Sequence, residues 1–130
     1  MILLDTHTAI WLVGQPAKLS KNARAAIEKG MLAGERPTCS VISLYKAGYA
    51  AHRGRLHLAY PIEGFIQRMQ EQFDWLPLSA EIALKAANLS ATFHGDPMDR
   101  FIAATAIVHR CPLITPDRRI HEAGVCKAIW

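Results

Sequence analysis

The 130-residue sequence predicts an α/β fold with a mainly parallel sheet, and two features of the chain carry that prediction. Short apolar stretches, typical of strands buried on both faces of a sheet, alternate with longer stretches of helical composition. The alternation runs along the whole chain without a repeat, a low-complexity tract or a linker. We therefore expect a single domain over residues 1–130, with helices covering both faces of the sheet.

The expected strands are short and rich in apolar or β-branched residues. The chain opens with MILL, and a later strand reads LIT, so neither alternates between polar and apolar side chains. Continuous apolar runs of this length suit strands that are covered on both sides. Strands are expected at residues 1–4, 38–42, 75–78, 113–115 and 125–129.

The expected helices begin at recognisable start signals. Ser20, Ser43 and Ser79 stand where a side-chain oxygen would cap a helix, and Pro61 suits a first helical turn. A loop over residues 94–99 precedes an alanine-rich helix. Helices are expected at residues 6–13, 20–33, 44–52, 61–73, 79–89, 100–109 and 118–123.

Composition narrows the class of protein. Fifteen Lys and Arg against eleven Asp and Glu give a formal charge of +4, a mild excess that is compatible with a polyanionic partner. The three cysteines are widely spaced and include no Cys-x-x-Cys, which favours reduced core thiols over disulfides or a zinc site. No apolar run approaches the roughly 20 residues of a membrane span, and the first residues lack the features of a leader. We expect a cytoplasmic protein with no membrane association.

Four aspartates fall at strand ends or at helix starts: Asp5, Asp96, Asp99 and Asp117. Ligands of open α/β sheets gather beyond the carboxyl ends of the strands. Several carboxylates meeting there would repel one another without a cation, and Mg²⁺ or Mn²⁺ prefers such oxygen ligands. Helix capping is the competing interpretation, since Asp96 precedes Pro97 and both Asp99 and Asp117 would lie in first turns or caps.

Longer segments make the metal interpretation more specific. The chain contains, in order, LLDTHTAIWLV, ISLYKAGYAAHRGRL, LSAEIALKAANL, HGDPMDRFIAATAI and CPLITPDRRI. This series resembles the PIN-domain family of VapC-type toxins over essentially the whole chain. The resemblance implies a PIN-like three-layer α/β/α sandwich, Mg²⁺-dependent endoribonuclease activity on RNA and neutralisation by a small cognate antitoxin.

The resemblance also implies roles for individual residues. Asp5 matches the strand-end acid of the family, Asp99 the acid that opens the alanine-rich helix, and Asp117 the acid of the Thr-x-Asp turn. These three would hold the metal ion. Asp96 matches the first acid of the Asp-Pro-x-Asp motif, where a cap and a metal contact both remain open.

Lys46 departs from the family pattern. The family places a catalytic glutamate after a tripeptide such as Ser-Leu-Trp, and this chain reads Ser43-Leu44-Tyr45-Lys46. With Ser43 as cap, the lysine would also oppose the helix dipole at the third helical position. We expect a weakened or inactive nuclease in which the ammonium acts as an internal counter-ion. Alternatively, Lys46 reaches solvent and three aspartates still hold one ion.

Further residues are expected to support the site. By resemblance, Thr6 and Thr115 supply hydroxyl groups beside the acids. Trp11 and Trp130 suit either the core or a surface for a homodimer or an antitoxin. Basic residues that would hold the RNA backbone are Arg53, Arg55, Arg100, Arg118 and Arg119.

Two other functions compete with catalysis. A degenerate PIN module would keep RNA or antitoxin binding without cleavage, and Lys46 favours it. A phosphate-accepting receiver domain also combines strand-end acids with a lysine, but it expects an acidic pair after the first strand. Here Thr6 and His7 follow Asp5 instead, which disfavours a receiver domain.

Overall fold

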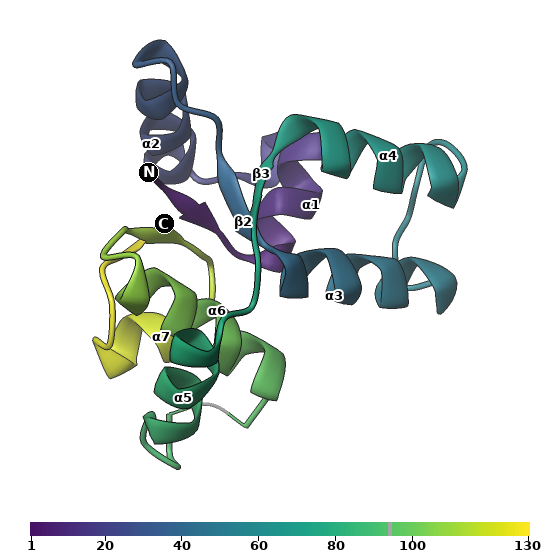
Figure 1. Ribbon diagram of the computed structural model, residues 1–130. Coiled ribbons are helices and arrows are strands. Elements are labelled where there is room, and N and C mark those ends of the chain that lie inside the picture. The colour runs from purple at the N-terminus through teal and green to yellow at the C-terminus, as the bar shows by residue number, and fades with distance from the viewer. Residues whose placement is uncertain (94) are drawn as a thin grey trace.

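The computed structural model describes residues 1–93 and 95–130, so His94 of the expected loop lies outside the described residues. Among these described residues, five strands form one sheet in the order β3-β2-β1-β4-β5, and every neighbouring pair is parallel (Figure 1). The predicted parallel α/β fold is confirmed. The strands are β1 (Leu3–Leu4), β2 (Thr38–Ser40), β3 (Asp74–Leu76), β4 (Leu113–Ile114) and β5 (Ala128–Ile129).

Helices connect and cover the strands. Within the described residues, none of them combines the length and the apolar character that crossing a membrane requires. The helices are α1 (Thr6–Gly14), α2 (Lys21–Leu32), α3 (Val41–His52), α4 (Ile62–Gln72), α5 (Ala80–Asn88), α6 (Pro97–Val108) and α7 (Arg118–Ala123), with a short 3-10 helix η1 (Pro16–Lys18) after α1.

The two residues of the central strand β1 contribute to two separate hydrophobic cores, one on each face of the sheet. Successive side chains of a strand point to opposite faces, and both Leu3 and Leu4 are fully buried. Leu4 packs with residues of α1 to α4, including Phe65 and Met69. Leu3 packs with Ile102 of α6 and Ile120 of α7. Figure 1 shows α1, α2 and α4 on one side of the sheet and α5, α6 and α7 on the other. The sheet is therefore the middle layer of a three-layer sandwich.

The start of α3 corrects one prediction. Residues 38–42 were expected as strand because Val41 and Ile42 are β-branched, but the helix begins at Val41 and Ser40 caps it. The Ser40 hydroxyl accepts a hydrogen bond from the Ile42 N–H at 3.2 Å, whereas Ser43 is buried and accepts one from Thr6. Lys46 consequently lies in the second turn of α3. The expected opposition between the lysine and the helix dipole is therefore wrong, because that effect is confined to the first turn.

The helix expected from residue 100 begins earlier, at Pro97. Asp96 is its N-cap, and the carboxylate accepts a hydrogen bond from the Met98 N–H at 2.9 Å. Pro97 fits the first helical position because its fixed φ suits a helix and its missing N–H is not needed there. Asp99 therefore lies in the first turn, with its side chain directed from the start of α6.

Candidate active site

Asp5 is held by strand pairing. β1 pairs with β4 in the register Leu3–Leu113 and Leu4–Ile114, and the Asp5 N–H donates to the Ile114 carbonyl at 3.1 Å. The residues that follow the two strands, Asp5 and Thr115, are therefore neighbours. This rigid backbone mount fixes the first acid of the site at the carboxyl edge of the sheet.

The Asp5 carboxylate is buried, with only 6% of the residue exposed. One oxygen caps α1 by accepting from the Thr8 N–H at 2.8 Å, and the other accepts from the Thr115 hydroxyl. Burial raises the pKa of Asp5 above its ordinary value, even though these hydrogen bonds favour the charged form. A cation close to this carboxylate would offset the cost of keeping it ionised.

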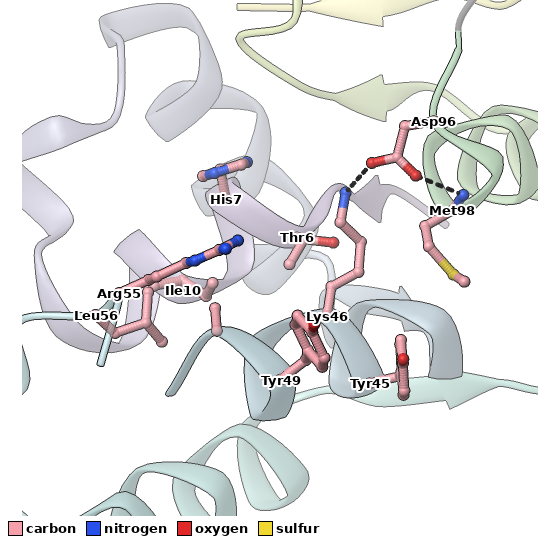
Figure 2. A pocket seen from close by; sticks show the side chains of 11 residues that line it. Thr6, His7, Ile10, Tyr45, Lys46, Tyr49, Arg55, Leu56, Asp96 and Met98 are labelled. Carbon is pink, nitrogen blue, oxygen red and sulfur yellow. Dashed lines mark hydrogen bonds and ion pairs between the residues drawn. The ribbon is translucent and has the colours of Figure 1, made fainter. Parts of the chain in front are cut away.

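Lys46 reaches from α3 to the start of α6. Its ammonium lies 2.8 Å from Asp99 Oδ1, and the lysine side chain is only 19% exposed. Figure 2 shows the second contact, with Asp96 Oδ2 at 3.4 Å. Burial by itself would lower the pKa of Lys46, but the hydrogen bonds and charges of Asp99 and Asp96 raise it. The lysine is therefore charged at neutral pH and points to the acids, not to solvent.

Asp96 belongs to the same ion-pair cluster. Burial opposes ionisation of this carboxyl, yet the Met98 N–H and the Lys46 ammonium lower its pKa below the ordinary value. The residue thus has two visible functions, as the cap of α6 and as a second anion beside Lys46. The capping role expected from the Asp-Pro pair is present together with the charge role.

Asp117 is the N-cap of α7, on the same side of the sheet as α6. Its side chain accepts from the Arg119 N–H at 2.9 Å, and its own N–H donates to the Thr115 hydroxyl oxygen at 3.1 Å. Thr115 thereby joins Asp5 to Asp117. All four aspartates and Lys46 line one cavity of about 430 Å³, which we call the acid cavity.

The donor chemistry of the acid cavity suits a hard divalent ion, because four carboxylates line it. The charge arrangement is less suited, since Lys46 already supplies a cation to two of the acids. Among residues 1–93 and 95–130, no three acidic, histidine or cysteine side chains are grouped closely enough to hold a metal ion. An ion binding there would compete with the ammonium.

The predicted basic residues separate into two groups. Arg53 and Arg55 are exposed near the C-terminal end of α3, and Arg118 and Arg119 are exposed at the start of α7. Arg100 differs, because its guanidinium donates to the carbonyl oxygens of residues 86, 89 and 90 at 2.7–3.0 Å. That arginine joins the end of α5 to α6, which favours a structural role over contact with RNA.

A second cavity of about 400 Å³ adjoins the acid cavity, and both are lined by His7, Lys46 and Asp96. Tyr45 and Tyr49 of α3 form part of its wall. Sequence reasoning assigned neither tyrosine to the site. The available signal was their spacing of four residues, which places both rings on one helix face.

Comparison with known proteins identifies the family to which this fold belongs. The PIN domain family matches residues 2–125, and the chain belongs to that family. The chain is 35% identical over 121 residues to Ribonuclease VapC22 of Mycobacterium tuberculosis, covering 93% of this chain and 90% of that protein.

Solved structures show the same fold at low sequence identity. VapBC2 of Rickettsia felis bound to a promoter DNA fragment matches with a TM-score of 0.74 and 14% identity, over 98% of this chain and 97% of that one. DNA-bound VapBC of Salmonella typhimurium matches with a TM-score of 0.72 and 18% identity, over 98% and 95%. A toxin-antitoxin complex of Klebsiella pneumoniae matches with 0.65 and 21%, over 97% and 95%.

Proposed function

We propose that this chain is a metal-dependent endoribonuclease toxin whose activity is reduced by Lys46. The observation that carries the proposal is the acid cavity, which is lined by Asp5 after β1, Asp99 in the first turn of α6 and Asp117 at the start of α7. Membership of the PIN family and similarity to a named ribonuclease support it. Metal dependence is general for ribonucleases of this family, and Mg²⁺ or Mn²⁺ is our proposal for the ion.

Asp5, Asp99 and Asp117 would hold the ion, with Asp96 as a further contact. When bound, the ion supplies a Lewis acid and a water of lowered pKa for attack on a phosphodiester. The chain itself supplies the geometry: Thr115 and the Thr8 N–H orient the Asp5 carboxylate, and the pairing of β1 with β4 holds the adjoining backbone. This chemistry needs no covalent nucleophile on the protein.

Lys46 is the reason for expecting reduced activity. An acid at that position would add a negative charge to the acid cavity, whereas the lysine removes one by pairing with Asp99 and Asp96. Divalent-metal affinity depends strongly on the charge of the ligand set. We therefore propose weakened metal binding as the cause of weakened cleavage.

Partners follow from the same proposal. RNA would be the substrate, and exposed Arg53, Arg55, Arg118 and Arg119 would contact its phosphates. A small antitoxin would neutralise the chain, as the VapBC and toxin-antitoxin complexes among the structural matches suggest. A homodimer and a cytoplasmic location remain part of the proposal.

A second candidate is a PIN module that binds RNA or an antitoxin without cleavage. The 2.8 Å ion pair between Lys46 and Asp99 favours it, because an ammonium at that distance occupies one of the proposed metal ligands. The two candidates share the binding surface and differ only in turnover.

Cleavage of a labelled structured RNA tests the proposal. We expect slow cleavage with Mn²⁺ that EDTA abolishes and that Asp5→Asn removes, and faster cleavage by Lys46→Glu. Activity that persists in EDTA would contradict metal dependence. Retained RNA binding without turnover in both the parent chain and Lys46→Glu would instead favour the non-catalytic module.

A further inference from the structure

Two tyrosines on α3 face solvent beside the acid cavity. Tyr45 is 58% exposed and Tyr49 is 43% exposed, although aromatic rings of this size are usually buried. Their ring centroids lie 6.0 Å apart with an interplanar angle of 28°, a stacked arrangement. The core side of α3 is formed by other residues, among them Ala47 and Ala51. Packing of the fold therefore does not account for the two rings.

A cation extends this aromatic face by one further turn. The guanidinium carbon of Arg53 lies 4.8 Å from the centre of the Tyr49 ring, within the range of a cation–π contact. Residues 45, 49 and 53 are four apart, so they follow one another along a single helix face. This face presents flat π surfaces with a positive charge at one end.

The cavity beside these rings, which we call the tyrosine pocket, has a mixed lining. Tyr45 and Tyr49 form one wall, Ile10 and Leu56 are apolar, and Arg55 is basic. Figure 2 shows the side chains of His7 and Arg55 lying across the pocket from Tyr45. Because His7, Lys46 and Asp96 line the acid cavity as well, the two cavities are adjacent.

This combination matches the chemistry of a nucleotide. A nucleobase is planar and stacks on aromatic rings, and its phosphate is an anion that arginine attracts. The basic groups beside the pocket, Arg53 and Arg55, complement a polyanion. The formal charge of +4 also favours an anionic nucleotide over an apolar peptide as the ligand of this pocket.

We propose that the tyrosine pocket is a stacking subsite for one unpaired nucleobase next to the phosphate that enters the acid cavity. This inference rests on the proposed ribonuclease function and adds two specificity-determining residues to it, Tyr45 and Tyr49. The bases of a duplex are stacked on one another and cannot turn toward a side chain without unpairing. Tyr45 and Tyr49 would therefore hold a base only where the RNA is unpaired.

Binding in EDTA tests this subsite separately from cleavage. The probes are a short labelled oligouridylate and an RNA duplex of equal length, titrated with the full chain. We expect Tyr49→Leu and Tyr45→Leu each to weaken oligouridylate binding by about tenfold, as loss of a base-stacking ring does. Tyr49→Phe keeps the ring and should bind like the parent chain. Leu84→Ala, at an exposed leucine of α5, is the matched control.

Salt dependence separates stacking from charge. Tyr49→Leu should leave the slope of log affinity against log salt unchanged, whereas Arg55→Gln should reduce it by about 0.7. Equal oligouridylate affinity in the parent and both leucine variants, or tighter binding of the duplex, would overturn the proposal and leave the pocket as a surface for a protein partner. Failure of cleavage alone would count against the nuclease function and not against this subsite.

Discussion

At the scale of single residues, Thr115 is the buried link between two acids. Its hydroxyl donates to Asp5 and accepts from the N–H of Asp117, and the residue is fully buried. Such a hydroxyl cannot exchange its partners for water, so removing it leaves a buried carboxylate and an N–H without their partner. The sequence indicated a hydroxyl beside the acids but not that it joins two of them.

Thr115→Val should therefore destabilise the chain by about 1–3 kcal/mol in urea unfolding. Thr115→Ser keeps the hydroxyl and should lose clearly less. Thr105→Val is the matched control, because Thr105 is equally buried but donates only to the Phe101 carbonyl within its own helix. If Thr115→Val and Thr105→Val lower the free energy of unfolding equally, the hydrogen bonds from Thr115 to the two acids add no stability beyond that of an ordinary buried hydroxyl.

Cys126 gives a pH-dependent prediction at the same scale. Burial, with a smaller contribution from Cys111, raises the pKa of Cys126 from its ordinary 9.0 to about 11. The thiolate is the reactive form, so at pH 8 the thiol should alkylate about a hundredfold more slowly than one with the ordinary pKa. All three cysteines are free thiols, as the sequence predicted for a chain without disulfides.

Iodoacetamide labelling followed by mass spectrometry measures the Cys126 rate. Because the raised pKa keeps the group protonated throughout the range, the rate should rise about tenfold per pH unit between pH 8 and 9.5. A rate that levels off near pH 9 would mean that the thiol is not shielded as the structure has it.

At the scale of elements, the start of α6 combines capping with charge. Asp96 accepts from the Met98 N–H and also faces Lys46. Sequence reasoning proposed the cap because Asp precedes Pro, a local signal that needs no tertiary contact. It could not place Lys46 against this helix, because residues 46 and 96 meet only through the packing of α3 on α6.

Asp96→Asn and Asp96→Ala separate the two roles. Both remove the charge beside Lys46, but asparagine caps helices about as well as aspartate does. We expect Asp96→Ala to be about 1 kcal/mol less stable than Asp96→Asn in urea unfolding at neutral pH. If both variants lose the same stability, the ion pair and not the cap is what Asp96 contributes to the fold.

The start of α3 shows where local signals mislead. Val41 and Ile42 favour a strand by propensity, and Ser43 looks like a cap, yet Ser40 caps and the helix includes all three residues. The deciding interactions are tertiary, because Ser43 is buried against Thr6 of α1. Lys46 is therefore too far from the helix start to oppose the dipole. Its charge still lies beside Asp96 and Asp99, as the ion pairs show.

At the scale of the whole molecule, apolar periodicity was enough to predict the sheet and its coverage. Continuous apolar strands predict burial on both faces, and Leu3 and Leu4 pack into separate cores. Strand order and the tyrosine pocket were not predictable, because both depend on which segments meet in space. The single domain over residues 1–130 remains a prediction, and the family match over residues 2–125 agrees with it.

The sequence left Trp11 and Trp130 as either core residues or part of a partner surface. In the structure both are partly buried. Their rings are 5.8 Å apart, and both are partly buried against the core cluster of α1 to α4. The contact joins the first helix to the end of the chain. An antitoxin or a second copy would meet this pair only at its exposed edges.

The central claim is that Lys46 acts as a resident cation that competes with a divalent ion for the acid cavity. Calorimetric titration of Mn²⁺ into the parent chain, Lys46→Glu and Lys85→Glu tests it most directly, since Lys85→Glu makes the same charge change at an exposed site on α5. Replacing the ammonium by a ligand should tighten Mn²⁺ binding by about tenfold or more in Lys46→Glu, with Lys85→Glu unchanged. Equal affinity in all three proteins would contradict the account.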